Sequence, residues 1–407
     1  MKLPSASVLT VGDELLAGRV SNTNAAFLAQ RLTELGFMVA ATETVTDQEF
    51  DIADAIKRLC GRAEVVLVAG GLGPTPDDVT REALAGAAGS LLIVDAKLKR
   101  EIARRTKGVA PRKNQRMARV PEGAILFPNP VGTAAGLRVD VGGTPVYALP
   151  GVPMEAEVIF EESVVPDLEE VFATVEPPTR RVLRVYGLRE AEAAERLGGL
   201  LERGKEPSVG VTVKNGLLTV TVTGRGSDRR AEQIREELGL HIVGENGATP
   251  ASALLRMLKE RELSFATAES LTGGLVSAYF IGNSGASEVF GGGIVAYSAE
   301  QKHLLLDVPK TVLKREGSVS AETALRMARG ARRNLGVDVA VATTGVAGPE
   351  PDERGNAVGT GFVAVAGPKA GARGEKVIAF ECGGNRNAVR RRFAWTALDL
   401  ARRQLAK

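Results

Sequence analysis

Short apolar runs alternate with amphipathic segments along the first 165 residues of the chain. Residues 7–11, 64–69 and 146–149 are dominated by apolar side chains, whereas residues 22–35 and 156–172 repeat them at helical spacing. Strands that alternate with helices in this way are typical of β-α units around a largely parallel sheet. Glycines follow the runs that end at residues 69 and 149, where the functional loops of such sheets lie.

The pattern changes at residues 175–178, which include two consecutive prolines and therefore mark a domain boundary. Beyond it we expect strands at 180–186, 208–214 and 217–223 and helices at 189–201 and 228–238. Asn215-Gly216, between two β-branched runs, is a strong signal for a hairpin. These segments predict a small α+β domain over residues 174–247.

A third segment begins at Thr249-Pro250, because threonine favours a helix N-cap and proline the first helical position. We expect strands at 264–268, 293–297, 338–343, 361–366 and 376–381, and helices at 272–280, 321–335 and 387–405. The fold class is therefore a multidomain α/β protein. It has a doubly wound, mostly parallel sheet over residues 1–173, the α+β middle domain, and an α/β domain over residues 248–407.

The amino-acid composition limits the kinds of catalytic and binding site that this protein can form. The 407 residues contain only two His and two Cys, so a three-His zinc site and a disulfide framework are excluded. A net charge of +3 and an aromatic content of 4% disfavour nucleic acid as a partner. Without a signal peptide or a long apolar stretch, we expect a cytoplasmic protein without a membrane association. Catalysis would rest on hydroxyls, Lys, Arg, carboxylates and backbone amides.

A glycine-rich segment, Gly-Gly-Leu-Gly-Pro-Thr-Pro-Asp-Asp-Val-Thr at residues 70–80, directly follows the strand at 64–69. Glycines let backbone N–H groups approach a phosphate, and neighbouring carboxylates can hold a divalent cation that bridges phosphate oxygens. A loose glycine pattern also occurs by chance, in an ordinary turn before an Asp-capped helix. The residues of this segment alone leave both interpretations open.

Three further segments accompany the glycine-rich one, at residues 10–24, 129–136 and 149–155. Together the four closely resemble the molybdopterin-binding-like N-terminal domain of the CinA (competence/damage-inducible) family. The resemblance implies hydrolysis of the pyrophosphate of ADP-ribose-like nucleotides with a divalent metal, Mg²⁺, Mn²⁺ or Co²⁺. It assigns the nucleotide site to Asn24, Gly71, Gly73, Thr75, Asn129, Gly132 and Thr133. Its metal end is assigned to Asp78, with Asp77, Asp47 and Asp13 as further candidates.

The second candidate for chemistry is Ala-Thr-Ala-Glu-Ser-Leu-Thr-Gly-Gly-Leu at residues 266–275. Ser270 is expected where a strand becomes a helix, so that its hydroxyl and the first helix amides meet at a positive helix end. That position suits a nucleophile facing a developing oxyanion, although a helix N-cap is the other interpretation of such a serine. Because no suitable His is present, the base would be a Lys kept neutral by burial or nearby positive charge.

Residues 293–302 and 342–349 supply such a lysine and a small-residue loop, and they resemble the C-terminal amidohydrolase domain of the same family, the nicotinamide mononucleotide (NMN) deamidase. The resemblance makes Ser270 the nucleophile, Lys302 the general base and Tyr297 a group that relays or orients the proton. It places Thr344 and Gly345 near the reacting carbonyl. The substrate would also contact Gly273 and Gly274, and the deamidase needs no cofactor.

Arg386, at the start of the last expected helix, suits a nucleotide 5′-phosphate because a guanidinium there lies beside a helix N-terminus. Asn385 stands where the family more often has Asp, and residues 348–352 differ from the family's glycine-rich loop. The three consecutive arginines at 390–392 have the pattern of a solvated helix face.

The middle domain resembles the KH-type domain of full-length CinA proteins but has no Gly-x-x-Gly clamp for RNA between its two expected helices. Its expected role is to space the outer domains and support a homodimer. The sequence thus predicts a bifunctional enzyme that deamidates NMN to nicotinate mononucleotide and ammonia, and hydrolyses ADP-ribose to AMP and ribose 5-phosphate. Two alternatives stay open: a non-catalytic nucleotide sensor in the N-terminal domain, and a competence-related scaffold that binds DNA or a recombinase.

Overall fold

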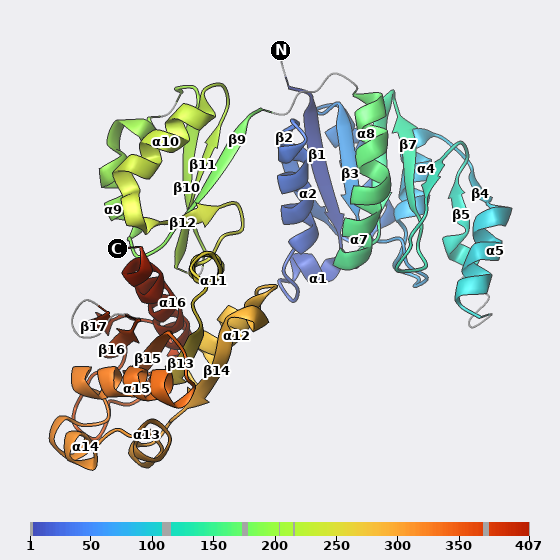
Figure 1. Ribbon diagram of the computed structural model, residues 1–407. Coiled ribbons are helices and arrows are strands. Elements are labelled where there is room, and N and C mark those ends of the chain that lie inside the picture. Colours follow the sequence, from blue (N-terminus) through green and yellow to red (C-terminus); the bar gives the residue numbers. More distant parts are fainter. Residues whose placement is uncertain are drawn as a thin grey trace. The chain divides into compact units, whose positions relative to one another are not determined.

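The computed structural model describes residues 3–107, 115–172, 178–202, 204–214, 216–368 and 374–406. The chain forms two compact units, Met1–Pro178 and Thr179–Lys407 (Figure 1). The domain boundary expected between residues 173 and 174, and Asn215 of the hairpin turn, lie outside the described residues. Among the described residues no helix is long and apolar enough to cross a membrane.

A six-stranded sheet runs through the first unit in the order β2-β1-β3-β8-β7-β6. Its strands are β1 (Ser5–Val11), β2 (Met38–Val45), β3 (Val65–Ala69), β6 (Ile125–Phe127), β7 (Gly136–Val141) and β8 (Thr144–Leu149). The three pairings from β2 to β8 are parallel, and the two that involve β7 are antiparallel. A separate two-stranded sheet pairs β4 (Leu92–Val94) with β5 (Arg119–Pro121).

Helices cover both faces of the six-stranded sheet. One face packs against α2 (Thr23–Glu34), α7 (Pro153–Ile159), the π-helical turn η1 (Phe160–Val164) and α8 (Val165–Val171). The other packs against α3 (Glu49–Cys60), α4 (Thr80–Ala88) and α5 (Ala96–Arg105), while α1 (Asp13–Leu16) is a single turn after β1. Alternation along β1 sends Val8 to the first face and Leu9 to the second. The doubly wound α/β arrangement is confirmed, and the helix expected at 156–172 is interrupted by η1.

The second unit begins with the small α+β domain. Its antiparallel sheet has the order β10-β11-β9-β12, formed by β9 (Arg180–Val185), β10 (Ser208–Lys214), β11 (Leu217–Thr223) and β12 (Ile242–Glu245). One face of the sheet packs against α9 (Glu190–Leu197) and α10 (Ser227–Leu238), with short 3₁₀ turns η2 (Gly198–Leu201) and η3 (Gly239–His241). The predicted pairing of 208–214 with 217–223 is confirmed.

A five-stranded sheet, in the order β14-β13-β15-β16-β17, forms the centre of the C-terminal domain. The strands are β13 (Phe265–Glu269), β14 (Phe290–Val295), β15 (Val339–Gly345), β16 (Thr360–Ala366) and β17 (Glu375–Glu381). The pairings of β13 with β14 and β15 are parallel, and the other two are antiparallel.

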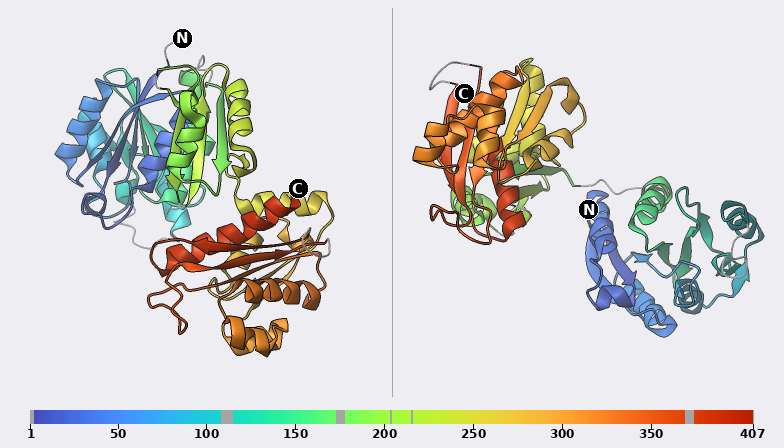
Figure 2. Two further views of the ribbon diagram at one scale, coloured as in Figure 1. Left: turned by 90° about the vertical axis from the view of Figure 1, so that its left-hand side faces the viewer. Right: turned by 90° about the horizontal axis from the view of Figure 1, so that it is seen from below.

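Helices cover both faces of this second α/β sheet. One face packs against α11 (Pro250–Glu260), α12 (Leu275–Ile281) and α16 (Arg386–Leu405). The other packs against α13 (Ala299–Leu306), α14 (Lys310–Glu316) and α15 (Ala321–Asn334), and η4 (Ala286–Glu288) is a short 3₁₀ turn. Figure 2 shows α16 and α15 on opposite sides of the strands. Three helices depart from expectation, since α12 begins at Leu275 instead of residue 272 and the pattern did not predict α13 or α14.

Buried polar contacts join the middle and C-terminal domains within the second unit. The Tyr186 hydroxyl lies 2.9 Å from the Thr396 hydroxyl, and Arg402 Nη1 donates to the carbonyl of Ile242 at 3.3 Å. Asp399 accepts hydrogen bonds from Arg402 and Arg403 on the same helix. The last turns of α16 therefore anchor the C-terminal domain to β12 of the middle domain and to the loop before β12.

Candidate functional site

Ser270 and Lys302 are in direct contact. Ser270 directly follows β13, and Lys302 lies in the first turns of α13. Lys302 Nζ donates a hydrogen bond to Ser270 Oγ at 2.9 Å and lies 3.4 Å from the carbonyl oxygen of Tyr297. Only 6% of Ser270 and 1% of Lys302 are exposed. The geometry of a nucleophile beside its base is thus present before any substrate binds.

The environment of Lys302 favours its neutral form. Burial lowers the pKa of its ammonium from an ordinary value of 10.5 to about 8. At pH 7 roughly a tenth of these amines are therefore unprotonated. A neutral amine can accept the proton of a hydroxyl, which an ordinary surface lysine cannot do at this pH.

Backbone contacts fix the position of Ser270. Its N–H donates to the carbonyl of Thr343 at 3.0 Å, and its own carbonyl accepts from the N–H of Gly273 at 3.1 Å. The hydroxyls of Thr272 and Thr343 lie 2.7 Å apart. Gly273 and Gly274 have φ values of 57° and 93°, which favour glycine, so the chain turns sharply between Ser270 and α12.

The first amides of α12 do not face Ser270. Those of Val276 and Ser277 donate to the buried carboxylate of Glu269 at 3.0 and 2.8 Å. The helix N-cap is Gly274, so Ser270 does not cap this helix either. The expectation that helix amides meet the Ser270 hydroxyl is therefore wrong, because Glu269 already satisfies them.

Two other donors lie in the turn itself. Gly273 and Leu275 use their N–H groups within the turn, whereas those of Thr272 and Gly274 have no hydrogen-bond acceptor among the described residues. Arg390 of α16 donates to the carbonyls of Leu271 and Thr272 at 3.1 and 2.8 Å and holds the turn in place. The free amides are candidates for stabilising an oxyanion formed next to Ser270.

Tyr297 and Arg386 form the more exposed side of the site. Arg386 Nη2 donates to the Tyr297 hydroxyl at 2.8 Å, and Arg386 also bonds the carbonyl of Gly348. The Tyr297 hydroxyl makes no hydrogen bond to Lys302 or Ser270 among the described residues, and the tyrosine is 59% exposed. Asn385 caps α16 by accepting from the N–H of Ala388 at 2.9 Å. Tyr297 thus contacts Lys302 through its carbonyl, not through its phenol.

Thr344 and Gly345 lie at the end of β15. The Thr344 hydroxyl donates to the carbonyl of Ser318 at 2.6 Å, so it fastens the segment before α15. Gly345 faces β16 so closely that a Cβ would lie 2.8 Å from the carbonyl oxygen of Thr360. Both residues are placed by structural contacts, and the hydroxyl that lies next to the Ser270 turn belongs to Thr343.

The glycine-rich segment of the first unit forms a loop framed by Asp78. The Asp78 carboxylate accepts from the N–H groups of Gly73 and Thr75, each at 2.8 Å, and from the Thr75 hydroxyl. Thr80 fastens the other side of the loop through a 2.8 Å bond to the carbonyl of Gly70. Gly71 has a φ of 67°, and a Cβ there would overlap the Thr80 hydroxyl. Close backbone approach is therefore required in this loop.

A second loop of the first unit is organised by Asn129. Its side-chain oxygen accepts from the N–H groups of Val131 and Gly132 at 3.1 and 2.7 Å, and its amide donates to Glu155 at 2.6 Å. Thr133 is half-buried in the same loop. Asn24 connects α2 to the loop after β8, since its amide donates to the carbonyl of Gly151 at 2.8 Å. The buried side-chain oxygen of Asn24 has no partner among the described residues.

The four aspartates expected at the metal differ from one another. Both oxygens of Asp78 are engaged by the glycine-rich loop, so Asp78 frames the loop instead of facing outward. Burial and the nearby charges of Asp13, Glu14 and Asp77 raise the pKa of Asp47, against an opposing hydrogen bond from the Asp13 N–H. No group of three or more His, Cys, Asp or Glu among the described residues is arranged to hold a metal by itself. Asp13, Asp47 and Asp77 therefore do not form a three-carboxylate site, and a divalent cation beside Asp47 would take most of its ligands from phosphate oxygens and water.

Comparison with known sequences identifies the family. A CinA-like protein of Frankia casuarinae is 39% identical over 421 aligned positions, which cover 98% of this chain and 96% of that protein. One of Geobacter sulfurreducens is 39% identical with 98% of both chains covered. The chain belongs to the CinA family.

Three family models match successive parts of this CinA-family chain. Residues 7–170 match "Probable molybdopterin binding domain", residues 180–244 "Damage-inducible protein CinA KH domain", and residues 248–405 "CinA C-terminal domain". A crystal structure of the protein CinA with unknown function from Thermoplasma acidophilum is 37% identical, with a TM-score of 0.39, over 42% of this chain and 98% of that one.

Several contacts of the CinA-family site were not predicted from the sequence. Glu269 and Thr343 adjoin residues that the motifs singled out, but their roles depend on which way each side chain points. Arg390 was taken for part of a solvated face, whereas it bonds the Ser270 turn. Its position four residues after Arg386 on one helix was the available signal.

Arginines also hold the loops of the first unit. Arg116 donates to the carbonyls of Thr75 and Pro76, both at 3.0 Å, and Arg105 to that of Gly132 at 2.8 Å. Arg81 is 2% exposed and donates to the carbonyl of Leu72 at 2.6 Å, and burial lowers its pKa to about 10. The loops thus have cationic neighbours, which favours anionic ligands.

Proposed function

We propose that this CinA-family chain is a bifunctional hydrolase in pyridine-nucleotide salvage, and that its C-terminal domain deamidates NMN to nicotinate mononucleotide and ammonia. The observation that supports an amidohydrolase is the 2.9 Å contact between Ser270 Oγ and the buried Lys302 Nζ. The choice of NMN rests on the family resemblance of the segments around Ser270, Lys302 and Arg386.

In this reaction Ser270 Oγ attacks the carboxamide carbon while its proton passes to the neutral amine of Lys302. When the C–N bond breaks, the Lys302 ammonium gives that proton to the leaving nitrogen, and an ester to Ser270 is left. Water then attacks the ester and gives a proton to Lys302, which returns it to the departing Ser270 oxygen. The products are the carboxylic acid and ammonia.

The surrounding residues would hold the substrate in place. The free N–H groups of Thr272 and Gly274 would receive the carbonyl oxygen as it gains charge. Arg386 would bind the 5′-phosphate with the guanidinium that it now directs to Tyr297, because guanidinium and phosphate match in charge and geometry. Tyr297 would position Arg386 and, through its carbonyl, the Lys302 amine.

Ammonia release from NMN by the full chain tests the deamidase. Ser270→Ala removes the nucleophile and should lower the rate by roughly 10³-fold or more, because covalent catalysis is lost. The matched control is Ser284→Ala, since Ser284 is exposed in the same domain, and it should retain full activity. Full activity in Ser270→Ala would overturn the proposal.

For the N-terminal domain we propose hydrolysis of ADP-ribose to AMP and ribose 5-phosphate. The loops at Gly71–Gly73 and Asn129–Gly132, held in shape by Asp78 and Asn129, would form the walls of the pyrophosphate site. A divalent cation, Mg²⁺, Mn²⁺ or Co²⁺, would take most of its ligands from phosphate oxygens and water, with Asp47 as its protein ligand, and would neutralise charge on the phosphate oxygens. Asp78 would keep the loop in shape.

The second candidate function is a nucleotide sensor without catalysis, and the engagement of both Asp78 oxygens favours it. Metal-dependent release of AMP from ADP-ribose by the Ser270→Ala protein decides between them. If the domain is an enzyme, Asp47→Asn should lower AMP release at limiting metal, whereas the exposed Asp54→Asn should not. Binding of ADP-ribose without any AMP release would establish the sensor.

We also propose a homodimer in a reducing cytoplasm. The dimer is implied by the family resemblance, and the two free thiols, Cys60 and Cys382, fit a reducing compartment. Light scattering of the purified chain should give the mass of two copies, and a monomer mass at micromolar concentration would contradict the dimer.

A further inference from the structure

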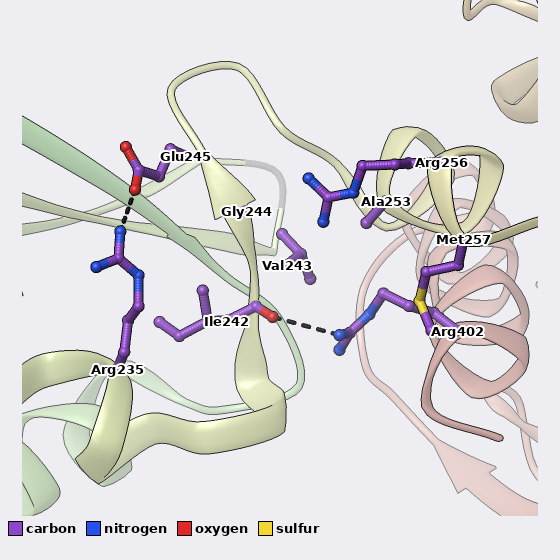
Figure 3. A pocket seen from close by; sticks show the side chains of 9 residues that line it. All are labelled: Arg235, Ile242, Val243, Gly244, Glu245, Ala253, Arg256, Met257 and Arg402. Carbon is purple, nitrogen blue, oxygen red and sulfur yellow. Dashed lines mark hydrogen bonds and ion pairs between the residues drawn. The ribbon is translucent and has the colours of Figure 1, made fainter. Parts of the chain in front are cut away.

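A pocket of about 420 Å³ lies between the middle and C-terminal domains, inside the second unit. Its walls come from α10 and β12 of the middle domain and from α11 and α16 of the C-terminal domain. The lining residues are Arg235, Ile242, Val243, Gly244, Glu245, Ala253, Arg256, Met257 and Arg402 (Figure 3). None of them belongs to the sites described above.

The charged residues of the lining are three arginines and one glutamate. Arg235 is paired with Glu245 and Glu232, so its charge is balanced inside the middle domain. Arg402 is 5% exposed and is held by Asp399 and by the carbonyl of Ile242. Their partners fix these two guanidinium groups before any ligand arrives.

Arg256 is the least compensated cation of the pocket. Its side chain is 66% exposed, and its ion pair among the described residues is a long contact of 3.7 Å with Glu260, which is also exposed. Figure 3 shows Arg256 and Arg402 reaching toward β12 from the helices of the C-terminal domain. A planar guanidinium that faces a pocket and lacks a close carboxylate is suited to bind an oxyanion, above all a phosphate.

The rest of the lining is apolar. Ile242 and Met257 are half-buried and leave apolar surface at the pocket, whereas Val243 and Ala253, at 3% and 4% exposed, leave very little. A methionine thioether and aliphatic side chains pack against flat ring systems. The volume of the pocket is typical of sites for small organic molecules and exceeds the needs of a lone phosphate ion.

From this combination of one available guanidinium, two fixed ones and an adjacent apolar wall, we propose that the pocket binds a nucleoside monophosphate. The phosphate contacts Arg256 near the fixed guanidinium of Arg402, and the base lies against the half-buried Ile242 and Met257. The site is separate from the Ser270 site and does not depend on either proposed hydrolysis.

Such a ligand would bridge the two domains of the second unit. Arg256 and Met257 lie on α11, while Val243 and Gly244 lie on β12, only a short loop before that helix. Arg402 is near the end of α16, whose first residues include Arg386 and Arg390 of the Ser270 site. Binding should therefore protect the hydrogen bonds of β12 and α11 from opening.

Hydrogen exchange of the full chain, followed by mass spectrometry with and without AMP, locates the binding. We expect slower exchange in peptides that cover residues 235–260, in addition to any protection in the first unit. Adenosine, which lacks the phosphate, should give no protection there at the same concentration. Equal protection by adenosine, or none in these peptides at saturating AMP, would overturn the proposal.

Substitution of one arginine tests the contact itself. In Arg256→Ala, half-maximal protection of residues 235–260 should need about ten times more AMP, because a charge-assisted hydrogen bond is lost. Its matched control is Arg326→Ala, since Arg326 forms a similar i,i+4 pair with Glu322 on α15, outside the pocket. An unchanged AMP dependence in Arg256→Ala, or an equal loss in Arg326→Ala, would contradict the site.

Discussion

The two glycine-containing turns of this protein, one after β3 and one after β13, occupy equivalent places in two α/β sheets but are built for different tasks. In the turn after β13, the central feature is a reactive pair, Ser270 and a lysine whose pKa burial lowers to about 8. In the turn after β3, no pair of this kind is present among the described residues, and Asp78 and Thr80 instead hold the backbone open. One turn prepares a side chain for bond formation, whereas in the other a carboxylate occupies the amides of Gly73 and Thr75 and holds the loop in shape.

The largest effect expected from this comparison is at Lys302. Lys302→Met keeps the length of the side chain but removes the base, so ammonia release from NMN should fall by about 10²- to 10⁴-fold. Lys259→Met is the matched control, because Lys259 is a partly exposed lysine paired with Glu288 in the same domain. AMP release from ADP-ribose should be the same in the wild-type protein, Lys302→Met and Lys259→Met. Ammonia release by Lys302→Met at the rate of the control would show that the reactive pair is not what distinguishes the two turns.

A smaller effect is expected at Gly71 of the other turn. Gly71→Ala places a methyl against the Thr80 hydroxyl in a left-handed backbone conformation and should destabilise the first unit by roughly 2–3 kcal/mol. Gly86→Ala in α4 is the control: open space surrounds it, and helix propensity should make the variant more stable by about 0.5–1 kcal/mol. Thermal unfolding of the two variants measures the difference. If Gly71→Ala were as stable as Gly86→Ala, the backbone at Gly71 would not be constrained.

The pH dependence separates the two turns further. Since neutral Lys302 is the base, kcat/KM for deamidation should rise about tenfold per pH unit below a pKa of about 8 and level off above it. The lowered pKa of Lys302 also makes the folding stability depend on pH. Between pH 8 and 10.5 the unfolded chain binds the Lys302 proton more tightly, so the contribution of Lys302 to stability improves as pH rises through that window. A flat rate profile from pH 6 to 9 would contradict a neutral lysine base.

The smallest effect is expected at the two histidines, which belong to neither turn. His303 lies 3.0 Å from the carbonyl of Val308, and His241 lies 3.1 Å from that of Tyr186. Replacing both with Gln should cost about 1 kcal/mol of stability per lost hydrogen bond and leave both activities within about twofold. A loss of ammonia release beyond tenfold, in a folded double variant, would assign a histidine to the chemistry.

The sequence predicted β3, β13 and the positions of the two turns that follow them, because buried strands and glycines have strong local signals, but it did not predict β2, β6, β7 or β12. It did not predict α13, and the reason lies in its buried face. Lys302 and Leu306 are buried, whereas Leu304 and Leu305 are 60% and 41% exposed, so the apolar pattern points away from the core. Lys302, which makes the site reactive, stands at a buried position of α13 where an apolar side chain would be expected, and for this reason the pattern does not indicate a helix.

Side-chain direction explains the other differences. The start of α12 was placed three residues early because Gly273 and Gly274 adopt left-handed conformations that a hydrophobic pattern does not record. Asp78 stands beside Asp77 in the sequence, yet only Asp78 turns back to the loop amides. The direction in which each side chain of a turn points depends on its tertiary contacts. Adjacent residues of the same type, such as Asp77 and Asp78, can therefore have different partners.

The central claim is that Ser270 forms a covalent ester during deamidation. Rapid acid quenching of the full chain with NMN, followed by peptide mass spectrometry, tests it most directly. We predict a nicotinate mononucleotide adduct on the peptide that contains Ser270, formed before steady-state ammonia release and absent from Ser270→Ala. Ammonia release by the wild-type protein with the adduct on another peptide, or continued release by Ser270→Ala, would contradict the claim.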